Sequence, residues 1–277
     1  MVQEESLKKL QTCLILIADE IKRICDNNSI KFFLMGGSLL GAVRHEGIIP
    51  WDDDLDIGML RDDYEAFIMA CEQELRKDFI LCNPYSEEGY GVPFTKIRLK
   101  GTRFEDEGVP DTVNNGIFID VFPIDVLPDS KIQRYWQNIH VKLWRNALAA
   151  KCGYGGNDKK VRFRRIVMSP FLLLKQSTLA NKVDKWEKKY NGIRSDMYVN
   201  FTSAYSFGKE IFPKETLEGL LPLVRFESLM LPTPRNPEYS LSKLYGDYMR
   251  FPPIEDRVPK HVCSEIDFGE YENILLR

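Results

Sequence analysis

Acidic residues crowd together near the start of the chain, at Asp52, Asp53, Asp54 and Asp56. In the run DLDI at 54–57, acidic and apolar residues alternate, so on a strand both acids project from the same face. Neighbouring carboxylates repel one another, and each binds a proton more readily unless a cation lies between them. Carboxylate oxygens suit a hard cation such as Mg²⁺, with Mn²⁺ as an alternative. The pattern therefore predicts a metal site that includes Asp54 and Asp56.

A glycine-rich turn precedes these acids. Gly36, Gly37 and Ser38 follow a short apolar run and open a helix-like stretch. Free backbone N–H groups and the helix dipole at such an N-terminus favour a bound phosphate. A GGS turn alone is common, but here it stands 16 residues before an acidic strand. The combination predicts a metal-dependent enzyme that acts on a phosphate ester.

A further acid, Asp120, lies inside the almost wholly apolar run GIFIDVF at 116–122. Because an unpaired buried carboxylate is costly, this acid needs a partner. In one interpretation Asp120 caps or pairs with a core arginine. In the other, strand pairing brings it beside Asp54 and Asp56 as a third metal ligand.

Calcium binding and a plain acidic turn are the alternatives for the acidic run. An EF-hand loop that starts at Asp52 would need glycine at its sixth position and glutamate at its twelfth. The chain has Ile57 and Asp63 there, so the EF-hand interpretation fails. A solvated acidic turn would leave the alternation of acidic and apolar residues without a reason.

The elements that must position these residues alternate between helix and strand over the first half of the chain. Hydrophobic spacing predicts amphipathic helices over 4–28 and 61–77, and a short helix over 38–45. Strands are expected at 31–35, 54–59, 79–82, 92–99 and 116–122. This alternation favours an α/β or α+β sheet whose acids face one side.

The second half is predicted to be largely helical and then irregular. Helices are expected at 132–150, 158–176 and 178–190, with Pro170 kinking or breaking the second of them. Residues 197–231 are expected to be irregular apart from a strand at 226–231, and a helix is expected at 236–245. The Pro-rich loop that follows should wrap the domain or line the site. We therefore divide the chain into a core (1–130), a basic helical region (131–195) and a C-terminal region that packs on the core (196–277).

Charge is distributed unevenly along the chain. Residues 131–190 carry 15 Lys or Arg against 3 Asp or Glu, whereas the whole chain has a net charge of −3. Such a block implies a polyanionic neighbour, namely nucleic acid, an anionic membrane surface or a phosphorylated substrate, unless it is simply a solvated face. Within it, residues 159–175 mix cations with apolar side chains, as interfacial helices do. Because no nucleic-acid-binding motif is present, we expect no nucleic-acid partner.

Composition describes an ordinary globular protein. The chain has 277 residues, 44% apolar and 29% charged, enough for one large domain or one domain with an appendage. Its six cysteines form no CxxC pair, which predicts free thiols in a reducing compartment and no structural zinc. No signal peptide or membrane-spanning run is evident. We expect a cytoplasmic protein. Peripheral contact with the inner face of an anionic membrane is an additional possibility that the basic block raises.

Three segments carry a resemblance to a known family. The segment GGSLLGAVRHEGIIPWDDDLDIGMLRDDYEAF at 36–67 resembles the LicD family of phosphocholine transferases, which includes the fukutin-related proteins. IDVFPID at 119–125 and YGDYMRFPP at 245–253 are similar to that family's later motifs, in the expected order. The resemblance implies an α+β, nucleotidyltransferase-like fold, with a mixed β-sheet core flanked by helices.

The resemblance also assigns roles to residues. The family's GS turn corresponds to Gly37 and Ser38, its paired metal ligands to Asp54 and Asp56, and its third acid to Asp120. The cysteine clusters of some animal relatives do not appear in this sequence, so no zinc site is carried over.

A reaction follows from the resemblance: Mg²⁺-dependent transfer of phosphocholine from CDP-choline to a sugar hydroxyl, with CMP released. The acceptor would be a cell-surface glycan, lipopolysaccharide or teichoic acid precursor, often built on a polyprenyl diphosphate. One alternative keeps the fold but uses another CDP-alcohol, such as CDP-ribitol, or a nucleoside triphosphate. Another class of interpretation is a non-catalytic membrane-surface module that acts through the basic block.

Further side chains become candidates for contact with such a substrate. Lys96 and Arg98 share one face of the predicted strand, where they would brace the diphosphate or simply be exposed cations. Arg44 lies close in sequence to the site. Trp51 offers an aromatic face to the quaternary ammonium of choline, with a core role as the alternative.

Overall fold

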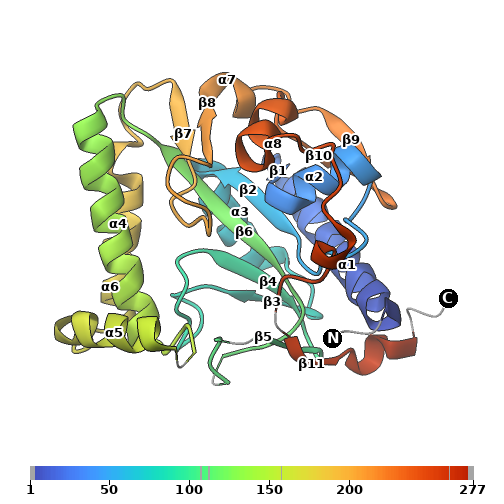
Figure 1. The fold of residues 1–277 in the computed structure, drawn as a ribbon, viewed down its shortest axis with the longest axis horizontal. Helices are drawn as coiled ribbons and strands as arrows, with labels where there is room; N and C mark the ends of the chain where they lie inside the picture. The colour runs from blue at the N-terminus through green and yellow to red at the C-terminus, as the bar shows by residue number, and fades with distance from the viewer. Residues whose placement is uncertain (1–3, 107, 112, 157, 262, 274–277) are drawn as a thin grey trace.

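Seven strands form a mixed sheet at the centre of the computed structural model, which describes residues 4–106, 108–111, 113–156, 158–261 and 263–273 (Figure 1). The strands are β1 (Phe33–Leu34), β2 (Asp56–Leu60), β3 (Phe79–Cys82), β4 (Thr95–Leu99), β6 (Phe118–Val126), β7 (Met197–Val199) and β8 (Ile211–Pro213). Their order is β1-β2-β6-β4-β3, with β7 and β8 added at the end of β6. The pair β2–β6 is parallel, and the other pairs are antiparallel. The predicted mixed sheet is confirmed.

β6 is the strand on which the sheet is built. It lies between β2 and β4, and Asp125 and Val126 at its far end pair with β7. Ile119 and Val121 are fully enclosed, which explains the apolar character of this run. Because β6 contacts three strands, residues at its start are held from both sides.

Helices α1 (Glu4–Asn28), α2 (Gly36–His45) and α3 (Arg61–Glu74) belong to this core. The bounds of α1 agree with the predicted helix, and its apolar stripe is buried at Leu7, Leu10, Leu14, Ile17, Ile21 and Ile24. α2 begins two residues before the predicted start, at the first glycine of the turn. α3 ends at Glu74 and not at residue 77, because Leu75 already has an extended conformation.

A second hydrophobic core holds the basic helices α4 (Lys131–Lys151), α5 (Lys159–Met168) and α6 (Gln176–Glu187). Figure 1 shows α4 and α6 side by side at the left of the sheet, with α5 below them. A break in the predicted helix over 158–176 is confirmed, since the short 3₁₀ turn η1 (Ser169–Phe171) contains Pro170. Another 3₁₀ turn, η2 (Lys188–Tyr190), follows α6.

The prediction of irregular structure over residues 197–231 is wrong. This stretch contains β7 and β8, the short helix α7 (Lys214–Leu217), and the hairpin β9 (Leu223–Phe226) and β10 (Leu229–Pro232). The expected strand at 226–231 is instead a hairpin that turns at Glu227, whose φ is +53°. These elements have three or four residues each, too few for hydrophobic periodicity to reveal them.

The C-terminal region ends with more regular structure than expected. α8 (Pro237–Tyr245) confirms the predicted helix, and the Asn236 side chain caps it by accepting a hydrogen bond from the Tyr239 amide at 3.1 Å. β11 (Cys263–Asp267) pairs with β5 (Arg103–Asp106), a connection that the sequence did not predict. The 3₁₀ turns η3 (Ile254–Asp256) and η4 (Gly269–Asn273) flank it.

Cysteine chemistry agrees with the sequence for the side chains that the structure describes. Cys13, Cys25, Cys71, Cys82 and Cys152 are free thiols, and burial raises the pKa of Cys13 to about 12. The sixth cysteine, Cys263, has its side chain outside the described part. In the described ranges, every helix is too short or too polar to cross a bilayer.

Candidate active site

Strand pairing brings Asp56 and Asp120 side by side. Asp56 begins β2 and lies directly opposite Asp120 of the parallel strand β6. The Asp120 amide donates to the Leu55 carbonyl at 3.1 Å, which fixes this register. The predicted proximity of the two acids is confirmed.

The carboxylates of Asp52, Asp54, Asp56 and Asp120, which we call the acid cluster, affect one another strongly. Burial, and then Asp54, raises the pKa of Asp52 to about 7. Burial is also the main cause that raises the pKa of Asp54, and burial with Asp54 and Asp120 raises that of Asp56 well above its ordinary value. Asp52 is only 3% exposed, and its Oδ1 has no hydrogen-bond partner among the residues that the structure describes. A divalent cation would resolve this repulsion, so these residues fit the expected metal.

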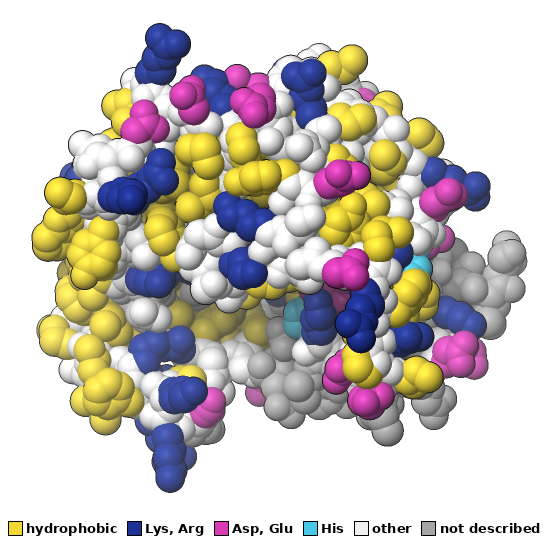
Figure 2. Space-filling view, turned by 45° about the horizontal axis from the view of Figure 1, so that its top comes forward, with side chains coloured by type: hydrophobic (Ala, Val, Ile, Leu, Met, Phe, Trp, Pro, Cys, Tyr) yellow, Lys and Arg dark blue, Asp and Glu magenta, His cyan; other side chains and the backbone are white. Residues whose placement is uncertain are grey.

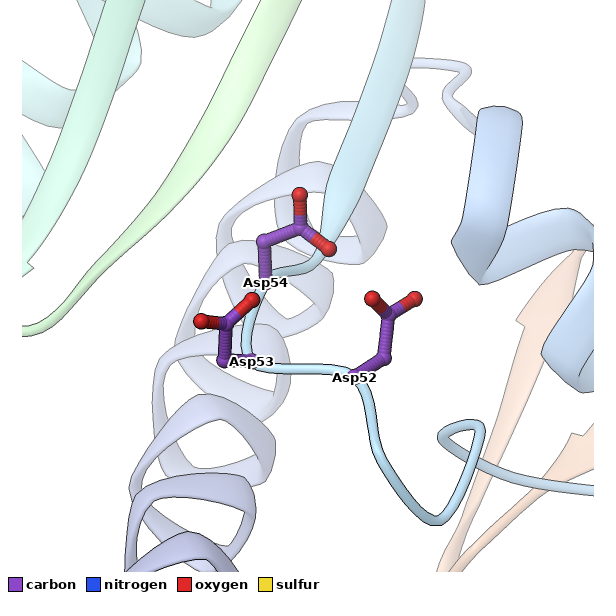
Figure 3. Close-up of side chains that lie close together, drawn as sticks. All are labelled: Asp52, Asp53 and Asp54. Carbon is purple, nitrogen blue, oxygen red and sulfur yellow. The ribbon is translucent and has the colours of Figure 1, made fainter. Parts of the chain in front are cut away.

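Among the described side chains, the three carboxylates within 4.8 Å of one another are those of Asp52, Asp53 and Asp54 (Figure 3). Asp53 is already engaged, because it accepts hydrogen bonds from the Lys260 amide (3.3 Å), the His261 amide (3.1 Å) and His261 Nδ1 (3.2 Å). It therefore anchors the C-terminal region. Asp52, which we did not predict as a ligand, is the better candidate beside the predicted Asp54.

The glycine turn lies directly against the acid cluster. Gly36 has a φ of +52°, and a Cβ there would lie 3.1 Å from Asp56 Oδ2. A Cβ on Gly37 would lie 2.7 Å from Asp52 Oδ2. Both glycines are thus required for the close approach of this backbone to the carboxylates.

Ser38 connects the turn to β2. Its Oγ accepts a hydrogen bond from the Asp56 amide at 2.8 Å, which leaves the hydroxyl proton available for donation. The first-turn amides of α2 have no partner within the helix. Donation from Gly36, Gly37 and Ser38 to a substrate phosphate stays a prediction.

The two candidate cations of β4 differ in position. Lys96 is 7% exposed, and its Nζ lies 2.5 Å from Asp120 Oδ1 and 3.3 Å from the centroid of the Phe118 ring. Arg98 is 2% exposed and donates to the Gly116 carbonyl at 2.7 Å. The interpretation of both as exposed cations is wrong. Asp120 does have a basic partner, although it is a lysine and not the arginine we considered.

A cavity of about 610 Å³, which we call the central cavity, opens beside Asp120 and Lys96. Its opposite wall is basic and comes from the helical region, with Lys142 and Arg145 on α4 and Arg164 on α5. Figure 2 shows the hollow on this face, with lysine and arginine side chains around it. The cavity thus meets the acid cluster at Asp120 and has a basic side that suits phosphates.

Arg44 and Trp51 lie at a contact with the C-terminal region. Arg44 Nη1 donates to the Tyr248 carbonyl at 3.0 Å, and its Nε donates to His45 Nε2 at 3.0 Å. Burial and Arg44 lower the pKa of His45, which favours a neutral, orienting ring. The Trp51 ring faces the guanidinium groups of Arg44 (5.9 Å) and Arg257 (5.4 Å). In this structure, cations of the chain itself contact the predicted choline-binding surface.

Residues 245–261, which we call the closing segment, add groups that the sequence did not assign to the site. Burial opposes the charged form of Lys260, but Asp52 and Tyr205 raise its pKa overall. The hydroxyl groups of Tyr245 and Tyr205 share a hydrogen bond of 2.8 Å. The loop was expected to wrap the domain or to line the site, and the structure places its Lys260 near Asp52 and its His261 at the central cavity. Glu210 also raises the pKa of Asp56, and it lies in the stretch that we predicted to be irregular.

Comparisons with known proteins show which sequences this chain resembles. Residues 29–147 match the family model described as LicD/FKTN/FKRP, nucleotidyltransferase domain. The chain is 28% identical over 268 residues to the lipopolysaccharide cholinephosphotransferase LicD of Haemophilus influenzae, covering 93% of this chain and 96% of that protein. An uncharacterized protein of Rickettsia typhi is 50% identical over 92 residues, 33% of this chain and 26% of that one. The ribitol 5-phosphate transferase FKRP of Homo sapiens is 50% identical over 44 residues, 16% of this chain and 8% of that one.

Proposed function

We propose a phosphocholine transferase activity for the chain, because residues 29–147 match the LicD/FKTN/FKRP nucleotidyltransferase domain and 93% of the chain aligns with a lipopolysaccharide cholinephosphotransferase. The donor is CDP-choline, the acceptor is a sugar hydroxyl of a cell-surface glycan precursor, and CMP is released. The observation that carries the proposal is the acid cluster, enclosed against the glycine turn at the edge of the central cavity.

Asp52, Asp54 and Asp56 would hold Mg²⁺, with Mn²⁺ as the alternative, and the raised pKa values of these acids support this role. When bound, the ion would neutralise the diphosphate oxygens and the charge that develops on the leaving CMP. Ser38 and the first-turn amides of α2 bind the phosphate oxygens on the other side. The donor diphosphate is thereby held at the start of β2.

Asp120 takes the proton of the acceptor hydroxyl. It is the member of the acid cluster that lines the central cavity, and Lys96 holds its Oδ1 at 2.5 Å. An acceptor that enters the cavity therefore meets this carboxylate. Lys142 and Arg164, on the basic wall, bind the remaining phosphate charge of the substrates.

The choline group has two candidate aromatic contacts. Trp51 is the contact predicted from the sequence, but the Arg257 guanidinium lies 5.4 Å from its ring centroid. Phe94 and Tyr154 line the central cavity, as does Asp120, and offer aromatic side chains there. A Phe94→Leu variant that raises KM for CDP-choline without changing inhibition by CMP would favour the cavity over Trp51.

A second donor class keeps the same site chemistry. The local identity with the ribitol 5-phosphate transferase FKRP favours CDP-ribitol as the alternative, and a nucleoside triphosphate is the other. We prefer CDP-choline because the match to the cholinephosphotransferase extends over 93% of the chain, against 16% for FKRP.

The test is release of CMP from CDP-choline in the presence of Mg²⁺ and candidate glycans, with CDP-ribitol and ATP in parallel. Replacing both Asp54 and Asp56 by alanine should lower turnover by at least about 100-fold. A matched control replaces Asp19 and Asp62, which are exposed acids, and should leave turnover unchanged. Turnover that survives the first pair of substitutions contradicts the metal assignment. Thermal stabilisation by ATP but not by cytidine diphosphate compounds contradicts the donor.

A further inference from the structure

Helix α5 presents apolar side chains outward. Phe163 and Ile166 are 68% and 70% exposed, and Leu173, just beyond the helix, is 92% exposed. Val167 adds a further partly exposed apolar surface at 46%. A surface helix of a globular domain normally turns its apolar stripe towards the core. α5 buries Val161 and Met168 but leaves these other apolar side chains outside.

Basic side chains surround these apolar groups. Lys159, Lys160 and Arg162 are exposed on the same helix, and Lys175 follows it. No acidic residue occurs between 159 and 175. Residues 159, 163 and 166 fall on one helical face, so cations and apolar side chains share a single surface.

The inward face of α5 explains this orientation. Arg165 Nη2 donates to the Gly153 carbonyl at 2.7 Å, and Arg164 donates to the Tyr154 carbonyl at 2.5 Å. Two arginines therefore fix the helix to the Gly-rich turn after α4. These contacts hold the helix so that Phe163, Ile166 and Val167 stay on its outer side, while Val161 and Met168 are buried.

We propose that the outer face of α5 and the following turn, which we call the docking face (Lys159, Lys160, Phe163, Ile166, Val167 and Leu173), binds the surface of an anionic phospholipid membrane. Its apolar side chains enter the boundary between headgroups and acyl chains, while its cations contact lipid phosphates. Figure 2 shows hydrophobic and basic side chains together at the lower left, where α4 and α5 lie in Figure 1. A second copy of the chain is a poor occupant, since two such faces would oppose like charges.

The docking face adjoins the central cavity. Arg164 of α5 and Gly155 of the turn that holds it line that cavity. Binding of α5 to a membrane would thus bring the central cavity, on the inward side of this helix, close to the lipid surface. This last step rests on the proposed function, and it points to an acceptor that is anchored in the membrane.

The experiment is sedimentation of the purified full chain with vesicles of equimolar phosphatidylglycerol and phosphatidylcholine, compared with pure phosphatidylcholine. We expect binding to the anionic vesicles at low salt and release at about 1 M salt, where the Debye length is about 3 Å. Each exposed lysine or arginine should contribute about fivefold to the affinity. The double variant Ile166→Ser, Leu173→Ser should bind at least about tenfold more weakly.

A matched control replaces Met69 and Leu220, which are 59% and 91% exposed elsewhere on the chain, by serine, and should bind like the wild type. Equal binding to neutral vesicles, salt-resistant binding, or unchanged binding of the α5 variant overturns the proposal. So does a dimer in gel filtration that the α5 variant dissociates. CMP release in the presence of a water-soluble acceptor, measured without lipid, tests the proposed function separately. The α5 variant should retain this activity.

Discussion

Replacing Asp56 by asparagine should make the protein more stable without metal and inactive with it. Burial, Asp54 and Asp120 raise the pKa of Asp56 well above its ordinary value. A carboxyl group whose pKa is higher in the folded state costs stability once the pH exceeds its pKa in the unfolded chain, about 3.9. At pH 8, far above that value, the wild type therefore carries this cost, and asparagine removes it.

The magnitude follows from the surroundings of the carboxylate. The structure gives its side chain acidic neighbours, whereas its backbone amide is held by Ser38 Oγ at 2.8 Å and is unaffected by the substitution. Relieving such a buried, poorly compensated charge is worth about 1 to 4 kcal/mol. For a chain of this size, we expect the Tm to rise by about 2 to 10 °C in the absence of divalent cations.

Differential scanning calorimetry at pH 8, with EDTA and with Mg²⁺, measures both effects. The wild-type Tm should rise on addition of Mg²⁺, while the Asp56→Asn variant should start higher and respond little. Asp62→Asn, an exposed acid on α3, is the control and should behave like the wild type. The reasoning would be refuted by an Asp56→Asn variant whose Tm in EDTA is lower than that of the wild type, or whose Tm rises as much with Mg²⁺ as that of the wild type.

Three other substitutions test neighbouring contacts. Gly37→Ala places a Cβ 2.7 Å from Asp52 Oδ2, so the Mg²⁺ concentration for half-maximal CMP release should rise about tenfold or more; an unchanged value contradicts the close approach. Arg61→Met leaves Asp125, which Arg61 Nη2 contacts at 2.6 Å, without its buried partner, and should lower the urea-measured free energy of unfolding by about 3 to 5 kcal/mol. Burial raises the pKa of Glu187 from 4.5 to about 7, so its ionisation costs stability progressively as pH rises through this window. Between pH 4.5 and 7, the free energy of unfolding of Glu187→Gln should therefore rise by up to about 3 kcal/mol relative to that of the wild type. A difference between the two proteins that does not change with pH would contradict the raised pKa.

The sequence predicted the acid pair because its signal is local. Alternation at Asp54 and Asp56 fixes which side the carboxylates share, and the apolar run around Asp120 marks a central strand. Once β2 and β6 pair, the register brings Asp56 opposite Asp120. The fold class followed from the same alternation of helices and strands.

Contacts between distant segments could not be predicted in this way. Glu210 and Lys260 reach the acid cluster from about 150 to 200 residues further along the chain, from a turn and a loop that show no periodicity. The orientation of α5 was likewise hidden, because hydrophobic spacing reports that a helix is amphipathic but not whether its apolar face points to the core.

The closing segment explains how the free protein tolerates the acid cluster. Asp53 accepts three hydrogen bonds from residues 260 and 261, so the end of the chain is fixed to the loop that carries the acids. This places the Lys260 ammonium near Asp52 and Asp54, which raise its pKa. A single positive charge compensates the cluster only in part, since burial still raises the pKa of Asp52 to about 7. A divalent cation brings twice that charge to the same oxygens, so its binding should weaken the hold of the carboxylates on Lys260 and free this side chain for the substrate phosphates.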